Sequence, residues 1–148
     1  AWVSYPGLES DRYHQLHRKY CPHGAGAVFT FGLKGGYEAG IALVSNLKLF
    51  SHLANIGDTR SLVIHPASTT HRQLTDEQKT RAGAGPEVVR LSVGIEDPGD
   101  LIAEFASAIT EELDPVVADL GDRLDVCETQ IEAVRAFREK RPPEFRNR

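Results

Sequence analysis

A short segment around residue 90 alternates apolar and polar side chains and carries one arginine on its polar side. The segment is 88–95 (VVRLSVGI), in which Val89, Leu91, Val93 and Ile95 fall on one face. Period-two alternation is typical of a β-strand with one buried face. Arg90 belongs to the opposite face, with Ser92 and Gly94, so we expect its side chain to point away from the core.

Two interpretations of Arg90 follow from this pattern. A planar guanidinium with small residues around it is suited to hold a carboxylate or a phosphate through two parallel hydrogen bonds. An arginine that only makes a surface ion pair would give the same pattern. Periodicity alone leaves both interpretations open.

The rest of residues 1–110 predicts a small domain of mixed helices and strands. A second alternating run and a short apolar run indicate two more strands, and apolar stripes at helical spacing indicate helices. The first such stripe is Tyr13, Leu16 and Tyr20, after Ser10 as a possible helix cap. The pair Thr75 and Gln78 predicts a capping box at the start of one short helix. The expected order is helix 10–21, strand 24–33, helix 37–50, strand 61–65, helix 76–82, strand 88–95 and helix 98–109. This order predicts an α/β or α+β fold that packs its helices on one sheet.

Residues 111–148 differ in character from the rest. Apolar residues recur with a seven-residue period from Leu113 to Val134, which predicts a long amphipathic helix. Residues 111–134 carry eight acidic side chains, whereas residues 135–148 carry six basic ones. We therefore expect two parts: a domain over 1–110, and an appended helix with a basic, disordered tail over 111–148. The helix could pack on its own domain or pair with another chain.

Composition excludes several classes of protein. The formal net charge of −4 gives no general case for nucleic-acid binding. No run of apolar residues is long enough to span a membrane, and no signal-peptide pattern opens the sequence. Cys21 and Cys127 form no disulfide framework and suit a reducing compartment, so we expect a cytoplasmic protein. The sequence begins at Ala1 and contains no Met, which predicts a fragment of a longer chain.

One cluster of residues invites a metal interpretation. His14, His17, Cys21 and His23 are potential zinc ligands, but their spacing matches no closed zinc site. A solvated helix face is the favoured interpretation, and a zinc-dependent module remains as an alternative. We expect no metal site.

Four long phrases carry a family resemblance. They are YPGLES at 5–10, GAGAVFTFGLKGG at 24–36, NLKLFSHLANIGDTRSLVIHPASTTH at 46–71 and RLSVGIEDPGDLI at 90–102. In this order they resemble the C-terminal part of the Cys/Met-metabolism family of pyridoxal-phosphate enzymes. The variants NIGD and STTH resemble the branch of sulfhydrylases that act on O-acetylhomoserine. The resemblance covers residues 2–110.

The resemblance implies a fold and an activity. The fold is the C-terminal small domain of a fold-type I pyridoxal-phosphate transferase, a mostly antiparallel sheet with helices on one face. The implied activity converts O-acetylhomoserine and sulfide to homocysteine and acetate, in methionine and cysteine biosynthesis. The implied cofactor is pyridoxal 5'-phosphate, and the family is usually a homotetramer. Cystathionine γ-synthase and methionine γ-lyase are related alternatives.

The resemblance also implies roles for three residues. The arginine of the RLSVG phrase, Arg90 here, holds the α-carboxylate of the amino-acid substrate. Asn55 stands where the family commonly has a serine that lines the same pocket; its main chain can still make that contact. Thr70 stands where a loop approaches the substrate. No catalytic role is expected for His65 or His71.

One element of the family is missing from the sequence. The lysine that binds the cofactor lies in a Ser-x-x-Thr-Lys phrase, and no such phrase occurs here. Without that lysine the chemistry has no electron sink, so we expect that this chain alone is not a competent enzyme. A non-catalytic interaction module that uses the helix at 113–134 is the rival hypothesis.

Overall fold

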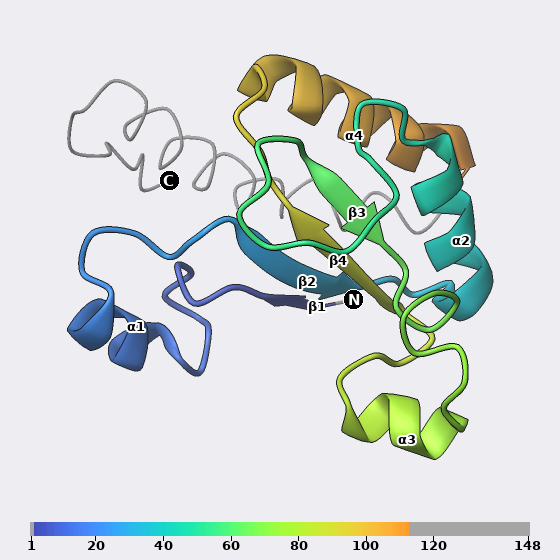
Figure 1. The fold of residues 1–148 in the computed structure, drawn as a ribbon, viewed down its shortest axis with the longest axis horizontal. Coiled ribbons are helices and arrows are strands. Elements are labelled where there is room, and N and C mark those ends of the chain that lie inside the picture. Colours follow the sequence, from blue (N-terminus) through green and yellow to red (C-terminus); the bar gives the residue numbers. More distant parts are fainter. Residues whose placement is uncertain (1, 113–148) are drawn as a thin grey trace.

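The computed structural model describes residues 2–112 and places their side chains as far as residue 109 (Figure 1). Four strands and four helices follow one another along these residues. In chain order they are β1 (Trp2–Ser4), α1 (His14–Tyr20), β2 (Val28–Gly32), α2 (Gly36–Asn46), β3 (Leu62–Ile64), α3 (Asp76–Arg81), β4 (Val88–Ser92) and α4 (Pro98–Glu112).

The strands form one sheet in the order β1-β2-β4-β3, and every neighbouring pair is antiparallel. This confirms the predicted antiparallel sheet. β4 is an inner strand, with Thr30 of β2 opposite Arg90 on one side and Ile64 of β3 opposite it on the other. Arg90 therefore stands at the middle of the sheet.

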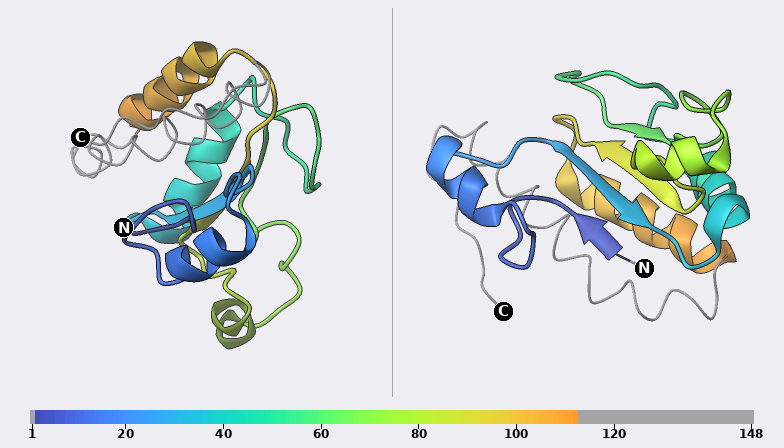
Figure 2. Two further views of the ribbon diagram at one scale, coloured as in Figure 1. Left: turned by 90° about the vertical axis from the view of Figure 1, so that its left-hand side faces the viewer. Right: turned by 90° about the horizontal axis from the view of Figure 1, so that it is seen from below.

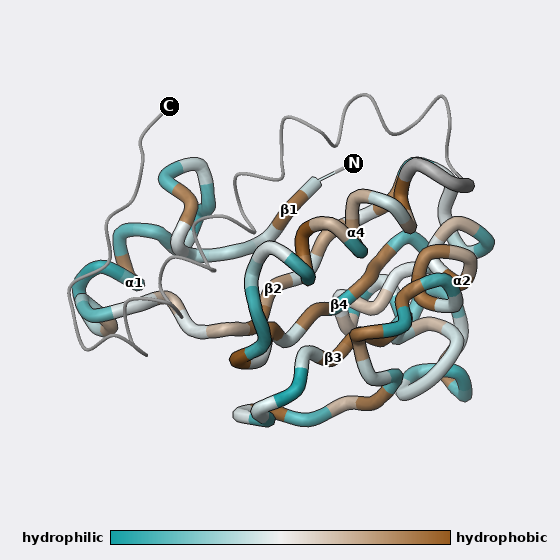
Figure 3. The backbone as a smooth tube through the Cα atoms, turned by 90° about the horizontal axis from the view of Figure 1, so that it is seen from above, coloured by the Kyte–Doolittle hydropathy of each residue, from teal (hydrophilic) through white to brown (hydrophobic). Residues whose placement is uncertain are grey.

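The hydrophobic core lies between the sheet and the helices α2 and α4, which cover one face (Figure 2). In Figure 3 the hydrophobic colour follows the inner strands and the two helices beside them. After Phe50, which still packs in this core, the chain that leads to β3 crosses to the other side of the sheet (Figure 2). The core residues include Phe29 and Phe31 of β2, Val89 and Leu91 of β4, Leu43 of α2, and Leu101 and Phe105 of α4.

Two predicted helix starts are confirmed. At α3, the Gln78 backbone N–H donates to the Thr75 hydroxyl (3.3 Å) and the Thr75 N–H donates to the Gln78 side chain (2.9 Å), which is a complete capping box. At α4, Asp97 accepts from the Gly99 N–H at 2.8 Å, and Pro98 is the first helical residue. Proline suits that position because the N–H it lacks would have no partner within the helix.

The first helix differs from the prediction. It begins at His14 and buries none of its residues, so the predicted apolar stripe of Tyr13, Leu16 and Tyr20 does not enter the core. Asp11, not Ser10, organises the chain before it by accepting from the N–H groups of Tyr5 (3.0 Å) and Tyr13 (2.8 Å). α1 follows the edge strand β1 and lies past the ends of β1 and β2, away from the other helices (Figure 1).

Two other element boundaries also differ. α2 ends at Asn46 rather than near Phe50, and the Glu104 carboxylate of α4 accepts from the next free N–H groups, those of Lys48 (2.6 Å) and Leu49 (2.7 Å). β4 ends at Ser92, and Ile95 is 58% exposed. The predicted open polar face of this strand is wrong at Ser92, which is buried, because β4 has strands on both sides and chain across its second face.

The amphipathic helix predicted over 113–134 and the tail after it lie outside the described residues. Within residues 2–112, no helix is both long and apolar enough to cross a membrane.

Candidate functional site

Arg90 projects from the face of the sheet that α2 and α4 leave uncovered. Its strand neighbours Val89 and Leu91 enter the core on the helix side, so alternation places Arg90 on the opposite side, as predicted. The residue is half-buried. Its hydrogen bond to the exposed Asn55 lies at the surface, where the guanidinium is open to an incoming anion.

The Arg90 guanidinium makes one hydrogen bond to the described part of the protein. Its Nη2 donates to the main-chain oxygen of Asn55 at 3.3 Å. No carboxylate among residues 2–109 lies within ion-pair distance of it, so the surface ion pair does not occur there. Because a guanidinium has five N–H donors, most of its capacity is left for a planar anion.

The side chain of Asn55 turns away from Arg90 and into its own loop. Its Nδ2 donates to Asp58 at 3.2 Å, and its Oδ1 accepts from the Ile56 N–H at 2.9 Å. Gly57 allows this tight turn, because its φ of +77° lies in the left-handed region. The main-chain oxygen of Asn55 is thereby left for Arg90.

Asp58 closes this turn. Its carboxylate accepts from the Arg60 N–H at 3.0 Å as well as from the Asn55 side chain. These two hydrogen bonds, that from Arg60 first, hold the pKa of the Asp58 carboxyl below its usual value of 3.8. Asp58 is therefore ionised at neutral pH, in the form that accepts both bonds.

The two ends of the loop meet at Ser51 and Ser61. The Ser51 N–H donates to the Ser61 oxygen (2.9 Å), and the Val63 N–H donates to the Ser51 oxygen (3.0 Å). The Glu96 carboxylate accepts from the N–H of Ser61 (2.7 Å) and from its hydroxyl (2.9 Å). The segment 51–61 is thus a closed loop anchored beside the end of β4.

Thr70 lies apart from this arrangement in the hydrogen-bond network. It is exposed on the chain between β3 and α3, and its hydroxyl pairs with the His71 Nδ1 at 2.8 Å. Among the described residues, no hydrogen bond joins it to Arg90 or Asn55. A role for Thr70 toward a substrate stays a prediction.

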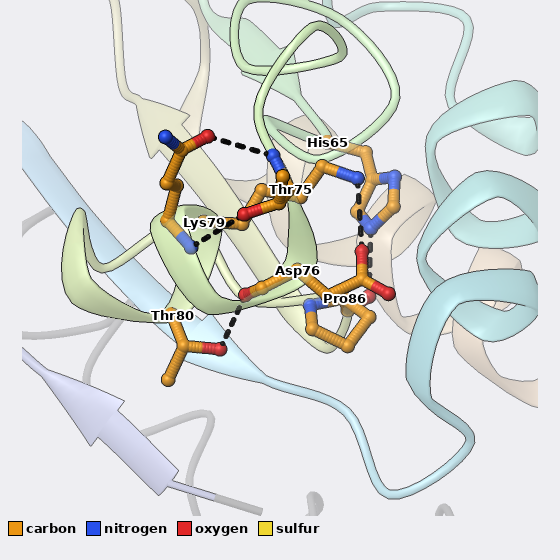
Figure 4. Close-up of polar contacts among 7 residues, drawn as sticks. His65, Thr75, Asp76, Lys79, Thr80 and Pro86 are labelled. Carbon is orange, nitrogen blue, oxygen red and sulfur yellow. Dashed lines mark hydrogen bonds and ion pairs between the residues drawn. The ribbon is translucent and has the colours of Figure 1, made fainter.

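His65 is buried and holds its surroundings together. Its Nε2 donates to the Pro86 oxygen at 2.8 Å, as Figure 4 shows beside the contacts of α3, and its Nδ1 pairs with the Ser68 hydroxyl at 3.0 Å. The Tyr37 ring packs against it edge-on, with ring centres 5.0 Å apart. Both ring nitrogens are occupied, which agrees with a structural histidine.

The described residues bring together neither a set of metal ligands nor the cofactor lysine. No group of three or more His, Cys, Asp or Glu side chains there could hold a metal ion, so the structure gives no support to the zinc interpretation of His14 to His23. Lys79 pairs with Asp76 at 3.2 Å within α3, and no lysine of the sequence lies in the family's cofactor phrase. The residues that are present therefore do not by themselves fit a pyridoxal-phosphate site.

Sequence reasoning missed the residues that shape the loop. The sequence Asn55-Ile56-Gly57-Asp58 could have indicated that Asp58 bonds within the turn, because Asn and Asp side chains commonly form such hydrogen bonds. Glu96 and Ser61 carried none. They are 35 residues apart in the chain, and only the fold brings them together.

Three comparisons relate this chain to known proteins. A family model described as Cys/Met metabolism PLP-dependent enzyme matches residues 1–110. O-acetyl-L-homoserine sulfhydrylase 1 of Thermus thermophilus is 59% identical over 109 residues, which are 74% of this chain and 26% of that protein. Homocysteine synthase of Schizosaccharomyces pombe is 54% identical over 108 residues, which are 73% of this chain and 25% of that protein. This chain thus spans about a quarter of the length of these relatives.

Solved structures agree in fold. A Campylobacter jejuni protein assigned as an O-acetylhomoserine (thiol)-lyase, solved with a pyridoxyl-lysine phosphate, superposes with a TM-score of 0.68 at 42% identity, over 74% of this chain and 26% of that one. Cystathionine γ-synthase of Xanthomonas oryzae, in complex with cystathionine, superposes with a TM-score of 0.67 at 35% identity, over 74% of this chain and 28% of that one. With the family model matching most of its length, this chain belongs to the Cys/Met metabolism family of PLP-dependent enzymes.

Proposed function

We propose that this chain supplies the part of an O-acetylhomoserine sulfhydrylase that binds the substrate's α-carboxylate. The single observation that carries the proposal is Arg90: a half-buried residue at mid-sheet, whose guanidinium has one hydrogen bond to a main-chain oxygen and no carboxylate of residues 2–109 paired to it. The names of the relatives, O-acetyl-L-homoserine sulfhydrylase and homocysteine synthase, support the choice of substrate and product.

The overall reaction breaks one bond and forms another at the γ-carbon of O-acetylhomoserine. The γ-carbon–oxygen bond breaks and acetate leaves with the bonding electrons. Sulfide forms the new carbon–sulfur bond, which gives homocysteine. In the family, pyridoxal phosphate provides the electron sink for this chemistry.

Arg90 contributes binding and orientation. Two parallel N–H···O bonds to the α-carboxylate fix both the position and the tilt of the amino acid, which a single point charge would not do. Asn55 holds the far edge of the guanidinium through its main-chain oxygen, so the side chain at that position is not required for the contact. Loss of such a charge-assisted bidentate contact costs about 2–4 kcal/mol of binding.

The chain alone is proposed to be catalytically inactive, because it lacks the Ser-x-x-Thr-Lys phrase that carries the cofactor lysine. The complete enzyme is proposed to be a cytoplasmic homo-oligomer. Cystathionine γ-synthase activity is the second candidate, favoured by the superposition on the Xanthomonas oryzae enzyme. The two differ in the sulfur nucleophile, which is sulfide in the first and cysteine in the second.

A chimeric enzyme tests the proposal. The whole chain is joined to the Thermus thermophilus sulfhydrylase in place of the residues that it matches, and initial rates are measured with O-acetylhomoserine and either sulfide or cysteine. We expect homocysteine to form from sulfide. The Arg90→Ala chimera should lose at least tenfold in kcat/KM, mostly through KM.

Arg81→Ala is the matched control, because Arg81 is an exposed arginine of α3 whose one ion pair within residues 2–109 is with Glu77. It should leave kcat/KM unchanged. An Arg90→Ala chimera with the parent's kcat/KM would refute the carboxylate role. Cystathionine formed from cysteine in preference to homocysteine from sulfide would favour the second candidate.

A further inference from the structure

We propose that Glu96 is a positioning residue for the Arg90 site: by anchoring Ser61, it holds the loop 51–61 where the Asn55 main-chain oxygen meets the guanidinium. The proposal rests on the proposed function of Arg90, because it concerns the geometry of that site. Glu96 makes no hydrogen bond or ion pair with Arg90 and acts through the loop.

Glu96 uses both of its carboxylate oxygens on one residue. Oε1 accepts from the Ser61 N–H at 2.7 Å, and Oε2 accepts from the Ser61 hydroxyl at 2.9 Å. The same hydroxyl accepts from the Gly94 N–H at 2.9 Å, so it both donates one hydrogen bond and accepts another. Ser61 is fully buried, which shields these bonds from competing water.

The outgoing limb of the loop is also packed against the chain that carries Glu96. The Ile95 N–H donates to the Thr59 oxygen at 3.0 Å. A methyl group on Gly94 would overlap the Thr59 oxygen and the Arg60 carbonyl carbon, both of which are main-chain atoms. The limb therefore lies in direct contact with residues 94–96, and the two Glu96 bonds add a side-chain anchor at Ser61 to these main-chain contacts.

The distance along the chain from this anchor to the site is short. Asn55 precedes Ser61 by six residues. Between them, the two hydrogen bonds of Asp58 restrain the backbone by linking the Asn55 side chain to the Arg60 N–H. A shift at Ser61 is therefore passed to Asn55 rather than absorbed. The Asn55 oxygen is the one described partner of the guanidinium, so its displacement releases Arg90 to other rotamers. A loosened guanidinium loses the preorganised geometry that fixes a carboxylate.

The first part of the test measures the loop in the intact 148-residue chain, without any ligand. Amide hydrogen exchange is compared for the parent, Glu96→Gln and Ser61→Ala, with Glu77→Gln as the matched control on α3. We expect the first two variants to speed exchange in residues 54–61 about tenfold or more while the β2 and β4 amides keep the parent's rates. Glu77→Gln should change nothing in the loop.

The second part measures the site in the chimeric enzyme described above. Glu96→Gln and Ser61→Ala should each raise KM for O-acetylhomoserine about tenfold and leave kcat within about twofold of the parent. In the Arg90→Ala background, Glu96→Gln should have no further effect on KM, because its influence passes through Arg90. That loss of effect separates positioning from a general weakening of the fold.

Parent-like exchange in residues 54–61 of both variants would overturn the proposal, whatever the enzyme does. So would faster exchange throughout the sheet, or a raised KM that persists at full size in the Arg90→Ala background. If Glu96→Gln does not fold, Ser61→Ala alone decides. Failure of the proposed function would give a different result. Arg90→Ala would then keep the parent's kcat/KM, while the hydrogen-exchange rates of the Glu96 and Ser61 variants would still report on the loop.

Discussion

Nη2 of Arg90 lies 3.3 Å from the main-chain oxygen of Asn55, although 35 residues separate the two in the chain. Arg90 belongs to β4, which pairs with β2 on one side and β3 on the other. Asn55 belongs to the loop 51–61, which crosses the face of the sheet opposite the helices (Figure 2). The Asn55 side chain is engaged with Asp58 instead. The site therefore depends on the path of the loop backbone more than on the identity of the residue at position 55.

Replacement of Arg90 by lysine tests whether geometry or charge matters. Arg90→Lys keeps the positive charge but removes the planar pair of donors, so it should recover little of the loss caused by Arg90→Ala. In the chimera, we expect Arg90→Lys to lower kcat/KM for O-acetylhomoserine by an amount equivalent to about 1–3 kcal/mol of transition-state binding energy. Full activity of Arg90→Lys would mean that a point charge suffices.

Gly94→Ala tests the close approach between the loop and the chain after β4. The new methyl group would overlap main-chain atoms of Thr59 and Arg60, which cannot move aside without moving the loop. We expect a loss of about 1–3 kcal/mol in the free energy of unfolding, measured by urea denaturation of the whole chain.

Gly99→Ala is the control for that substitution. Gly99 lies in the first turn of α4, where a Cβ would meet only the Asp97 side chain at 3.1 Å, and alanine is the better helix former. It should be neutral or slightly stabilising. A loss for Gly94→Ala no larger than that for Gly99→Ala would contradict the tight contact at Gly94.

The turn at Asn55 should open in acid. Hydrogen bonds from the Arg60 N–H and the Asn55 side chain lower the pKa of Asp58, so the contribution of its carboxylate is present above the usual pKa of 3.8 and is lost as pH falls through the lower folded value. The Arg60 amide chemical shift, followed by NMR, should titrate with a midpoint below 3.8. Asp58→Asn should abolish the titration, and a midpoint at or above the usual value would contradict the turn.

The buried Tyr5 hydroxyl should make the free energy of unfolding fall at alkaline pH. Burial raises its pKa to about 12 from an ordinary 10.0, and its hydroxyl donates to the Gly26 oxygen at 3.2 Å. Since the unfolded chain gives up this proton more easily, the stabilisation is complete below pH 10 and is lost as pH rises toward 12. The loss should reach about 2–3 kcal/mol. Urea denaturation at pH 8 to 12 should show a steeper decline for the parent than for Tyr5→Phe; identical slopes would refute the shift.

His65 and His71 should differ in how much their replacement lowers the free energy of unfolding. His65→Ala removes a buried ring and leaves the Pro86 oxygen without a donor, so we expect a loss of about 2–4 kcal/mol in unfolding free energy. His71→Ala, which removes a partly exposed ring paired with Thr70, should cost less than about 1 kcal/mol. Comparable losses would contradict the structural role of His65.

Local pattern was sufficient for much of the fold. The alternation in 24–33 and 88–95 predicted β2 and β4, and the capping pair Thr75 and Gln78 predicted the start of α3. Both kinds of pattern work because strand alternation and helix capping depend on residues that are near in sequence. The stripe of α1 failed for the complementary reason: periodicity shows that a helix has an apolar side, but not whether anything covers it.

The candidate site divides in the same way. The sequence by itself determined that Arg90 stands on the non-core face of a strand, because alternation is a property of the strand alone. Only the tertiary structure decided what surrounds it: the Asn55 oxygen, the turn closed by Asp58 and the Glu96 anchor on Ser61. The Asn55 and Glu96 contacts each join residues 35 positions apart, which local periodicity cannot register because the pairing is set by sheet order and by the closure of a loop.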